Sequence, residues 1–131
     1  VLGKAYKSTP GENAMGRVLI VEDNKINQRV LSKILQKQGF TYAIRANGEE
    51  GLKEIRENSA SYIVVLMDIQ MPIMNGLEAT QAIRNLGIEI PIIALTANAD
   101  EDECIDAGMQ AYLAKPFSAK VLGELVKKLR N

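Results

Sequence analysis

The sequence predicts an α/β protein in which five βα units surround a parallel sheet. From Arg17 onward, short apolar runs alternate with amphipathic stretches, which is typical of strands and helices that follow one another around such a sheet. At 131 residues the chain has room for one domain with its own core. We expect residues 17–131 to form that domain. Residues 1–16 lack periodicity and are rich in turn-forming residues, which predicts a linker or a leader left from expression.

Five short apolar runs are the predicted strands. The third contains the unbroken run from Ile63 to Met67, which is typical of a strand buried on both faces. The others are shorter but equally rich in aliphatic residues. The predicted strands are residues 18–21, 41–44, 62–67, 92–95 and 111–114.

An amphipathic helix is predicted after each strand. Aliphatic residues recur at helical spacing in the first helix, and glycines are placed to end the first and the fourth. Asparagine capping boxes open the second and third helices, acidic residues open the fourth, and a serine opens the fifth. These signals are Gly39 and Gly108 for the ends, and Asn47 with Glu50, Asn75 with Glu78, Asp100 and Ser118 for the starts.

The composition argues against two kinds of ligand surface. Lysine plus arginine and aspartate plus glutamate both number 16, so no net positive charge marks a nucleic-acid surface. With no tryptophan, two phenylalanines and four tyrosines, a base-stacking platform is not expected either. No apolar stretch approaches the ~20 residues that span a bilayer. We therefore expect neither nucleic-acid binding nor membrane contact by this chain.

The scarcity of cysteine and histidine narrows the chemistry further. Cys104 is the single cysteine, so no internal disulfide can form, which suits a reducing compartment such as the cytoplasm. The chain has no histidine and therefore lacks the commonest general base. If a phosphoryl group passes through histidine, a partner must supply that residue.

Four of the five predicted strands end in a side chain that can take part in chemistry. The first ends in Glu22 and Asp23, the third in Asp68, the fourth in Thr96 and the fifth in Lys115. In an open parallel sheet, ligands bind outside the carboxyl ends of the strands, where the strand order reverses. A flavodoxin-like doubly wound (βα)5 fold with strand order 2-1-3-4-5 places these four ends around one crevice. The second strand, which runs into an ordinary turn, lies to the side.

Taken together, these side chains predict a phosphoryl site with a metal ion. Singly, an aspartate at a strand end is more often a turn former, Thr96 could cap the next helix, and Lys115 could be a solvated lysine. Three carboxylates in one crevice would repel each other without a cation. Mg2+ fits, because it prefers oxygen ligands and needs only one or two carboxylates besides phosphate oxygens. Asp68 is the best candidate nucleophile, because a carboxylate can attack phosphorus and form an aspartyl phosphate.

Four motifs carry a family resemblance. VEDN (21–24), LMDIQMPIMNG (66–76), IALTAN (93–98) and YLAKPF (112–117) resemble, in order and spacing, the receiver domain of two-component response regulators. The residue sequences of the first three motifs are most similar to those of receivers attached to hybrid histidine kinases, which feed multistep phosphorelays.

The resemblance implies a role for each site residue. Asp68 accepts a phosphoryl group from a phosphohistidine on a partner histidine kinase or histidine phosphotransfer protein, in a reaction that depends on Mg2+, with Mn2+ as a substitute. Asp23, Asp68 and the backbone carbonyl of Gln70 bind the metal, supported by Glu22. Lys115 pairs first with the acceptor carboxylate and then with the phosphoryl oxygens.

The resemblance also implies a switch. Thr96 grips the phosphoryl group, and Tyr112 changes rotamer with it, which reshapes the face made by the fourth helix, the fifth strand and the fifth helix. Gln70 and Asn98 occupy positions that tune hydrolysis. Neither is a carboxylate that could activate water, so we expect a fairly persistent phosphoryl state. The resemblance also favours a cis bond between Lys115 and Pro116.

Two alternatives stay open at this point. A Mg2+-dependent phosphohydrolase with Asp68 as nucleophile usually has a second aspartate two residues later, where this chain has Gln70. A flavodoxin-like module for flavin or nucleotide would need a phosphate loop after the first strand, where Glu22 and Asp23 would repel an anion.

Whether the chain is an enzyme is therefore undecided. We expect mainly a signalling domain that catalyses its own phosphorylation and dephosphorylation. It would be a monomer or a weak phosphorylation-dependent dimer in the cytoplasm, tethered if it is part of a membrane hybrid kinase.

Overall fold

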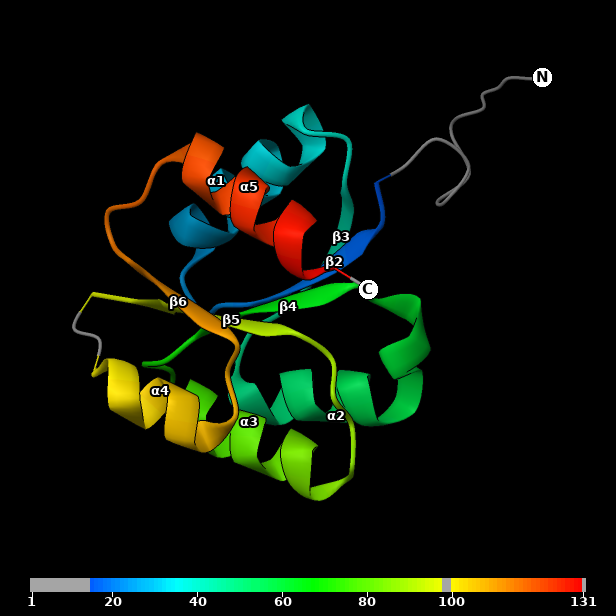
Figure 1. Ribbon diagram of the computed structural model, residues 1–131, viewed down its shortest axis with the longest axis vertical. Coiled ribbons are helices and arrows are strands. Elements are labelled where there is room, and N and C mark those ends of the chain that lie inside the picture. The colour runs from blue at the N-terminus through cyan, green and yellow to red at the C-terminus, as the bar shows by residue number, and fades with distance from the viewer. Residues whose placement is uncertain (1–14, 98–99, 131) are drawn as a thin grey trace.

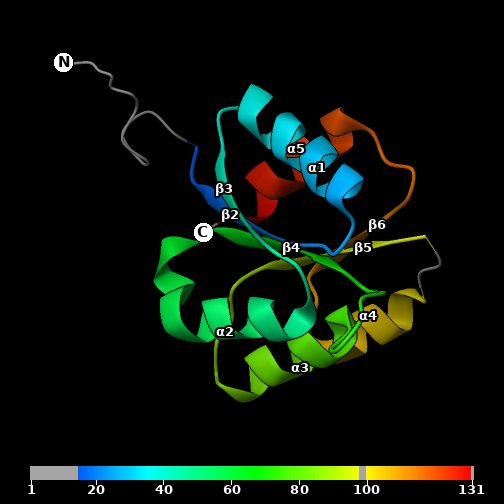
Figure 2. The ribbon, with the colours of Figure 1, turned by 180° about the vertical axis from the view of Figure 1, so that it is seen from behind.

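The computed structural model describes residues 15–97 and 100–130, which form three layers (Figure 1). A five-stranded parallel sheet lies in the middle, with α1 (Lys25–Lys37) and α5 (Ala119–Leu129) on one face. The other face is covered by α2 (Gly48–Asn58), α3 (Gly76–Asn85) and α4 (Glu101–Ala107), as the opposite view also shows (Figure 2). No helix within these two described stretches is both long and apolar enough to cross a membrane.

The strands have the predicted order. The sheet runs β3-β2-β4-β5-β6, and all four strand pairs are parallel, which is the order 2-1-3-4-5 of the flavodoxin-like fold. The strand order therefore reverses between β2 and β4. The strands are β2 (Arg17–Val21), β3 (Thr41–Arg45), β4 (Val64–Asp68), β5 (Ile92–Thr96) and β6 (Ala111–Ala114).

The bounds of the third strand differ from the prediction. It begins at Val64 rather than residue 62, because Tyr62 ends the short 3-10 helix η1 (Ser59–Ser61) and its backbone N–H bonds to Ser59. At the other end the strand includes Asp68, which pairs with Leu95 in the sheet. The carboxylate that the sequence places after the strand is thus its last residue.

Side-chain caps begin all five α-helices in the described residues. Each cap is the residue before the helix, and its side-chain oxygen accepts the backbone N–H three residues later, as N-caps do. The reciprocal capping box forms at Asn75 and Glu78. At α2 it is incomplete, because the Glu50 side chain accepts from the N–H of Ala46 rather than from Asn47. The five caps are Asn24, Asn47, Asn75, Asp100 and Ser118.

Each face of the sheet has its own hydrophobic core. Alternate residues of β4 point to opposite faces: Val65 and Met67 pack toward α2, α3 and α4, and Val64 and Leu66 pack toward α1 and α5. All four are fully buried, which explains why the sequence of this strand is apolar at every position rather than alternating. These two cores hold the strand ends rigidly at the edge where the polar residues gather.

Candidate functional site

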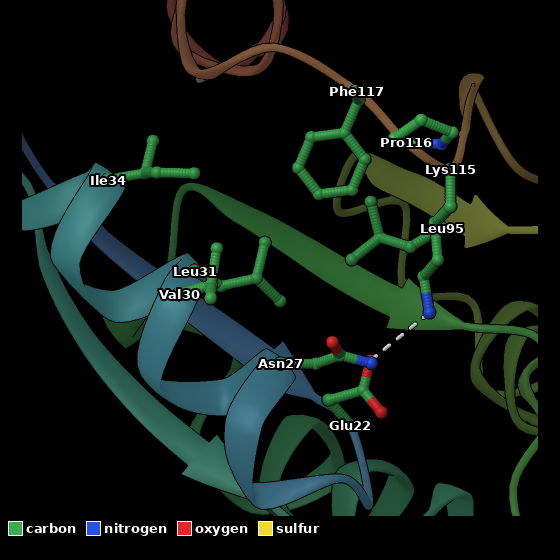
Figure 3. A pocket seen from close by; sticks show the side chains of 9 residues that line it. All are labelled: Glu22, Asn27, Val30, Leu31, Ile34, Leu95, Lys115, Pro116 and Phe117. Atoms are coloured by element: carbon green, nitrogen blue, oxygen red, sulfur yellow. Dashed lines mark ion pairs between the residues drawn. The ribbon is translucent and has the colours of Figure 1, made fainter.

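The carboxyl ends of four strands bring the predicted polar residues to one edge of the sheet. Glu22 and Asp23 follow β2, Asp68 ends β4, Thr96 ends β5 and Lys115 follows β6. One carboxylate oxygen from each of Glu22, Asp23 and Asp68 lies within 4.8 Å of the other two. The Lys115 Nζ lies 3.5 Å from Glu22 Oε1 and 3.7 Å from Asp68 Oδ1, and Figure 3 shows the first of these ion pairs.

Backbone hydrogen bonds position the acidic groups. The N–H of Asn24 donates to Glu22 Oε2 at 3.0 Å, and the Gln28 side chain donates to the Glu22 carbonyl at 2.7 Å. The N–H of Gln70 donates to Asp68 Oδ1 at 3.3 Å. The first two contacts come from the N-terminal turn of α1, so the start of this helix also sets the position of Glu22.

The three carboxylates differ in their exposure to water. Glu22 is 1% exposed and Asp68 is 6% exposed, whereas Asp23 is exposed. The pKa of Glu22 is raised to about 7, mainly by burial and also by the negative charge of Asp68, while the Asn24 N–H and Lys115 oppose the rise. Glu22 Oε1 is buried, and no residue in the described part of the chain donates a hydrogen bond to it. The site is therefore short of positive charge and of donors, as a site built for a cation would be.

The donor set suits a hard divalent cation. Three carboxylates on neighbouring strand ends offer oxygen ligands at close range, and Mg2+ and Ca2+ both prefer such ligands. The exposed Asp23 leaves one side of the cluster open to solvent, and Mg2+ usually keeps several of its waters. The residues present therefore fit Mg2+.

Two glycines that the sequence analysis did not single out shape the loop after Asp68. A Cβ atom on Gly76 would overlap the Asp68 carbonyl oxygen, and one on Gly48 would overlap the carbonyl oxygen of Met74. The N–H of Gly76 also donates to the Ile69 carbonyl at 2.9 Å. The sequence signal for this close approach was the Asn-Gly pair that opens both α2 and α3.

Thr96 and Tyr112 lie on neighbouring strands and face the same side of the sheet. In the register, Ala94 pairs with Tyr112 and Thr96 pairs with Ala114, and side chains two residues apart share a face. Thr96 is 3% exposed, and Tyr112 is half-buried against the core that lies under α2, α3 and α4. Asn98, which the resemblance marks as a tuning residue, lies outside the described residues.

An apolar groove runs from the acidic cluster along α1. It has a volume of about 400 Å³ and lies between that helix and the segment after β6, where the Lys115–Pro116 bond is cis (Figure 3). Glu22 and Lys115 lie at one end. The rest is mainly apolar and is lined by Val30, Leu31, Ile34, Leu95, Pro116 and Phe117. Sequence reasoning missed this groove, because its walls come from segments far apart in the chain.

Comparison with known proteins identifies relatives of the whole fold. The sequence model of the response regulator receiver domain family matches residues 18–127. Hybrid signal transduction histidine kinase I of Dictyostelium discoideum is 42% identical over 120 residues, which cover 84% of this chain and 7% of the kinase. Two-component response regulator ORR41 of Oryza sativa subsp. japonica is 40% identical over 121 residues, covering 88% of this chain and 95% of the rice protein. The chain thus spans a small part of the kinase and nearly all of the rice regulator.

Two solved structures extend the comparison to the site. One is the receiver domain of sensor histidine kinase PA1611 from Pseudomonas aeruginosa, described with a magnesium ion coordinated in its active-site cleft. It has a TM-score of 0.81 and 36% identity, with 88% of this chain and 98% of that chain covered. The other is the receiver domain of Ssk1 from Saccharomyces cerevisiae, in complex with the histidine phosphotransfer protein Ypd1. Its TM-score is 0.81 at 30% identity, with 87% of this chain and 88% of that chain covered.

Proposed function

Because the chain belongs to the response regulator receiver domain family, we propose that it is the phosphoacceptor switch of a two-component phosphorelay. Asp68 takes a phosphoryl group from a phosphohistidine on a partner histidine kinase or histidine phosphotransfer protein. The observation that carries this proposal is the placement of Asp68, a nearly buried carboxylate with two further carboxylates and the Lys115 ammonium beside it. Residues 17–131 form the functional domain in this proposal, and residues 1–16 are a linker or leader.

On this chain, the chemistry requires only carboxylates and one ammonium group, which the site provides; the partner supplies the phosphohistidine. A carboxylate oxygen of Asp68 attacks phosphorus, and an O–P bond forms as the P–N bond to the partner's imidazole breaks. The electron pair of the broken bond stays on the imidazole nitrogen, which takes up a proton from solvent water. Lys115 lies within reach of Asp68 and offsets the negative charge of the transferred group, which is the main catalytic contribution available in phosphoryl transfer.

In this proposal Asp23, Asp68 and the backbone carbonyl of Gln70 hold Mg2+, and Glu22 supports them from the buried side. The bound ion supplies positive charge to the phosphoryl oxygens, and Mn2+ substitutes for it. The carboxylate cluster of this chain supports this assignment, as does the relative whose cleft is described with magnesium.

We further propose that the output surface is the face made by α4, β6 and α5. Thr96 holds the phosphoryl group and moves toward Asp68, and Tyr112 repacks in response, which is a two-state change of the kind used by phosphorylation switches. Support comes from the shared face of Thr96 and Tyr112. The neighbouring helices also present apolar side chains to solvent, Ile105 on α4 at 57% exposure and Val121 on α5 at 47%.

The donor protein docks over α1 in this account. Ile26 and Val30 of α1 are 69% and 48% exposed, and the apolar groove beside Val30 opens at Glu22 and Lys115. A partner that covers this surface can bring its histidine to Asp68. We further propose that the chain acts in the cytoplasm, tethered when it belongs to a membrane hybrid kinase; support comes from its single cysteine, which suits a reducing compartment. The chain is a monomer or a weak dimer that depends on phosphorylation.

The test is an intact mass spectrum after incubation with acetyl phosphate and Mg2+. We expect a gain of one phosphoryl group in the wild type and none in Asp68→Asn. Consumption of acetyl phosphate without an adduct, together with turnover of a small phosphate monoester, would instead support the phosphohydrolase alternative. No adduct with the donor intact would contradict both functions for small donors.

A further inference from the structure

The charged side chains of this chain are divided by sign between the two faces of the sheet. On one face, α1 and α5 with the following Arg130 carry eight lysines and arginines and one acidic residue, Glu124. On the other face, α2, α3 and α4 with the Asp100 cap carry ten acidic residues and three basic ones. The net charge of zero therefore does not describe either face. The eight cations, which we call the basic surface, are all exposed: Lys25, Arg29, Lys33, Lys37, Lys120, Lys127, Lys128 and Arg130.

The cations of the basic surface act together. Among the described residues, none of the eight forms an ion pair. Lys25, Arg29 and Lys33 recur every four residues and so form one stripe along α1. The two helices lie on the same face of the sheet (Figure 2), and the Gln38 side chain after α1 donates to the Ala119 carbonyl of α5 at 3.0 Å. Packed helices are about 10 Å apart, which is about one Debye length at 0.1 M salt, so their positive potentials add.

Two of these cations lie where they oppose the helix dipole. Lys25 is the first residue of α1 and Lys120 is the second of α5, and neither helix has an acidic residue in its first turn. A cation is unfavourable there, because the N-terminus of a helix carries a partial positive charge. The three helices of the other face all have acidic residues in the first turn. The lysines at the starts of α1 and α5 lower the stability of their helices, so binding rather than folding accounts for them.

Exposed aliphatic side chains lie among the cations of the basic surface. Ile26 and Val30 on α1 are 69% and 48% exposed, and Val121 on α5 is 47% exposed. Each directly follows a lysine or arginine in the sequence. This combination is typical of helices that lie on an anionic bilayer, where cations meet lipid phosphates and aliphatic side chains enter the headgroup region. Nucleic acid would match the charges but not the aliphatic side chains, and neither helix has an aromatic residue on which bases could stack.

We propose that the basic surface binds the anionic headgroups of a lipid membrane, with Ile26, Val30 and Val121 inserted among them. The chain lies on the bilayer in this proposal and does not span it, so the lack of a spanning stretch does not bear on it. The acidic helices α2, α3 and α4 face away from the lipid, because the negative membrane surface repels them. The proposed function assigns part of α1 to the donor protein, so lipid and donor exclude each other there. Lipid binding itself does not depend on that function.

The test is co-sedimentation of the full chain with vesicles at low ionic strength. We expect binding to vesicles of phosphatidylcholine mixed with phosphatidylserine, none to phosphatidylcholine alone, and release as the salt concentration rises. Arg29→Gln/Lys33→Gln should weaken partitioning about thirtyfold, or about 2 kcal/mol for two cations. The matched control is Lys53→Gln/Arg56→Gln, which removes one exposed lysine and one exposed arginine from α2 on the acidic face and should bind like the wild type. Ile26→Asn should bind more weakly at every salt concentration.

Three results would overturn the proposal: a wild type that does not bind the phosphatidylserine vesicles, equal binding to neutral vesicles, or an equal loss in the α2 control. Double-stranded DNA is the comparison polyanion. DNA binding as tight as vesicle binding, with no effect of Ile26→Asn on either, would overturn the choice of lipid. Because every substituted side chain is exposed, we expect unchanged melting temperatures in all variants. None of these measurements involves phosphoryl transfer, so their failure would leave the proposed function standing.

Discussion

The Glu22 carboxylate lies almost fully buried beside two other carboxylates, and its chemistry follows from that setting. Its Oε2 accepts one backbone N–H, while Oε1 faces Lys115 without a hydrogen bond. Burial and the charge of Asp68 raise its pKa. At the scale of single residues, burial and the charge of Asp68 therefore disfavour the ionised form of Glu22.

The raised pKa of Glu22 predicts that the stability of the fold depends on pH. The pKa of Glu22 is raised from 4.5 to about 7 in the folded protein, so between these values the folded state binds more protons than the unfolded state. The stability that Glu22 contributes is fully present below about pH 4.5 and is lost as the pH rises through about 7. Urea unfolding in EDTA should show that Glu22→Gln gains stability over wild type between pH 5 and pH 8, on the order of 2 kcal/mol. A constant difference across this range would contradict the buried-acid account.

A second residue-scale prediction concerns the lifetime of the phosphoryl group. Gln70 is exposed at the mouth of the site and carries no carboxylate to activate water. We expect the phosphorylated protein to decay over minutes or longer in Mg2+, and Gln70→Glu to decay faster. Phosphate release after removal of the donor measures both rates, and a wild-type lifetime of seconds would rule the idea out.

At the scale of elements, Arg84 joins three segments on the side of the sheet covered by α3 and α4. Its guanidinium donates to the carbonyls of Ile88, Ile90 and Gly108 and to the Gln110 side chain, at 2.8 to 2.9 Å. These acceptors lie between α3 and β5 and between α4 and β6. One side chain thus aligns two connections that feed the strands ending at the site.

Replacing Arg84 should destabilise the fold without changing the proposed acceptance of a phosphoryl group by Asp68. Arg84→Met leaves several backbone carbonyls without donors, so we expect a loss on the order of 2 kcal/mol in the free energy of unfolding. Arg56→Met is the control, because the Arg56 side chain is half-exposed and, among the described residues, its one ion pair is a 4.0 Å contact with Glu57. Chemical denaturation of both variants checks this. Equal effects of the two substitutions would show that the arginine network is not important.

The elements also show what could be predicted from the sequence. The five strands, four of the five helix caps and the four polar strand ends follow from local patterns, because periodicity and capping are short-range properties. The Asn24 cap of α1 was not predicted, and the strand order came from the expected fold class rather than from a local pattern. The left-handed backbone of Ile73, whose φ is +70°, could not be foreseen, since the Gly48 N–H that holds the next carbonyl comes from a distant loop. The α1 groove and the raised pKa of Glu22 also depend on segments that only the fold brings together.

At the scale of the whole molecule, the site and the two ends of the described residues lie at opposite edges of the sheet. Met15 precedes β2, and its carbonyl accepts a hydrogen bond from Arg130, which follows α5, at 2.9 Å. The acidic cluster lies beyond the carboxyl ends of the strands. Met15 and Arg130 therefore lie away from the acidic cluster.

The same arrangement predicts that the metal stabilises the whole domain. In the proposed function Mg2+ binds only the folded cluster, so it should stabilise the fold by mass action, by about 2.7 kcal/mol at one hundred times its dissociation constant, and thereby raise the melting temperature. Asp68→Asn should be more stable than wild type in EDTA, because one of three neighbouring negative charges is gone, and should respond less to Mg2+. Thermal unfolding of both proteins with and without Mg2+ tests this, and a wild type that does not respond to Mg2+ would speak against the pocket.

The most direct test of the account locates the phosphoryl group itself. After phosphorylation in Mg2+, borohydride reduces an aspartyl phosphate to homoserine, and peptide mass mapping identifies the converted residue. The account predicts conversion at Asp68 alone. Conversion at Asp23 or another carboxylate, or none in protein whose intact mass shows a phosphoryl group, would contradict it.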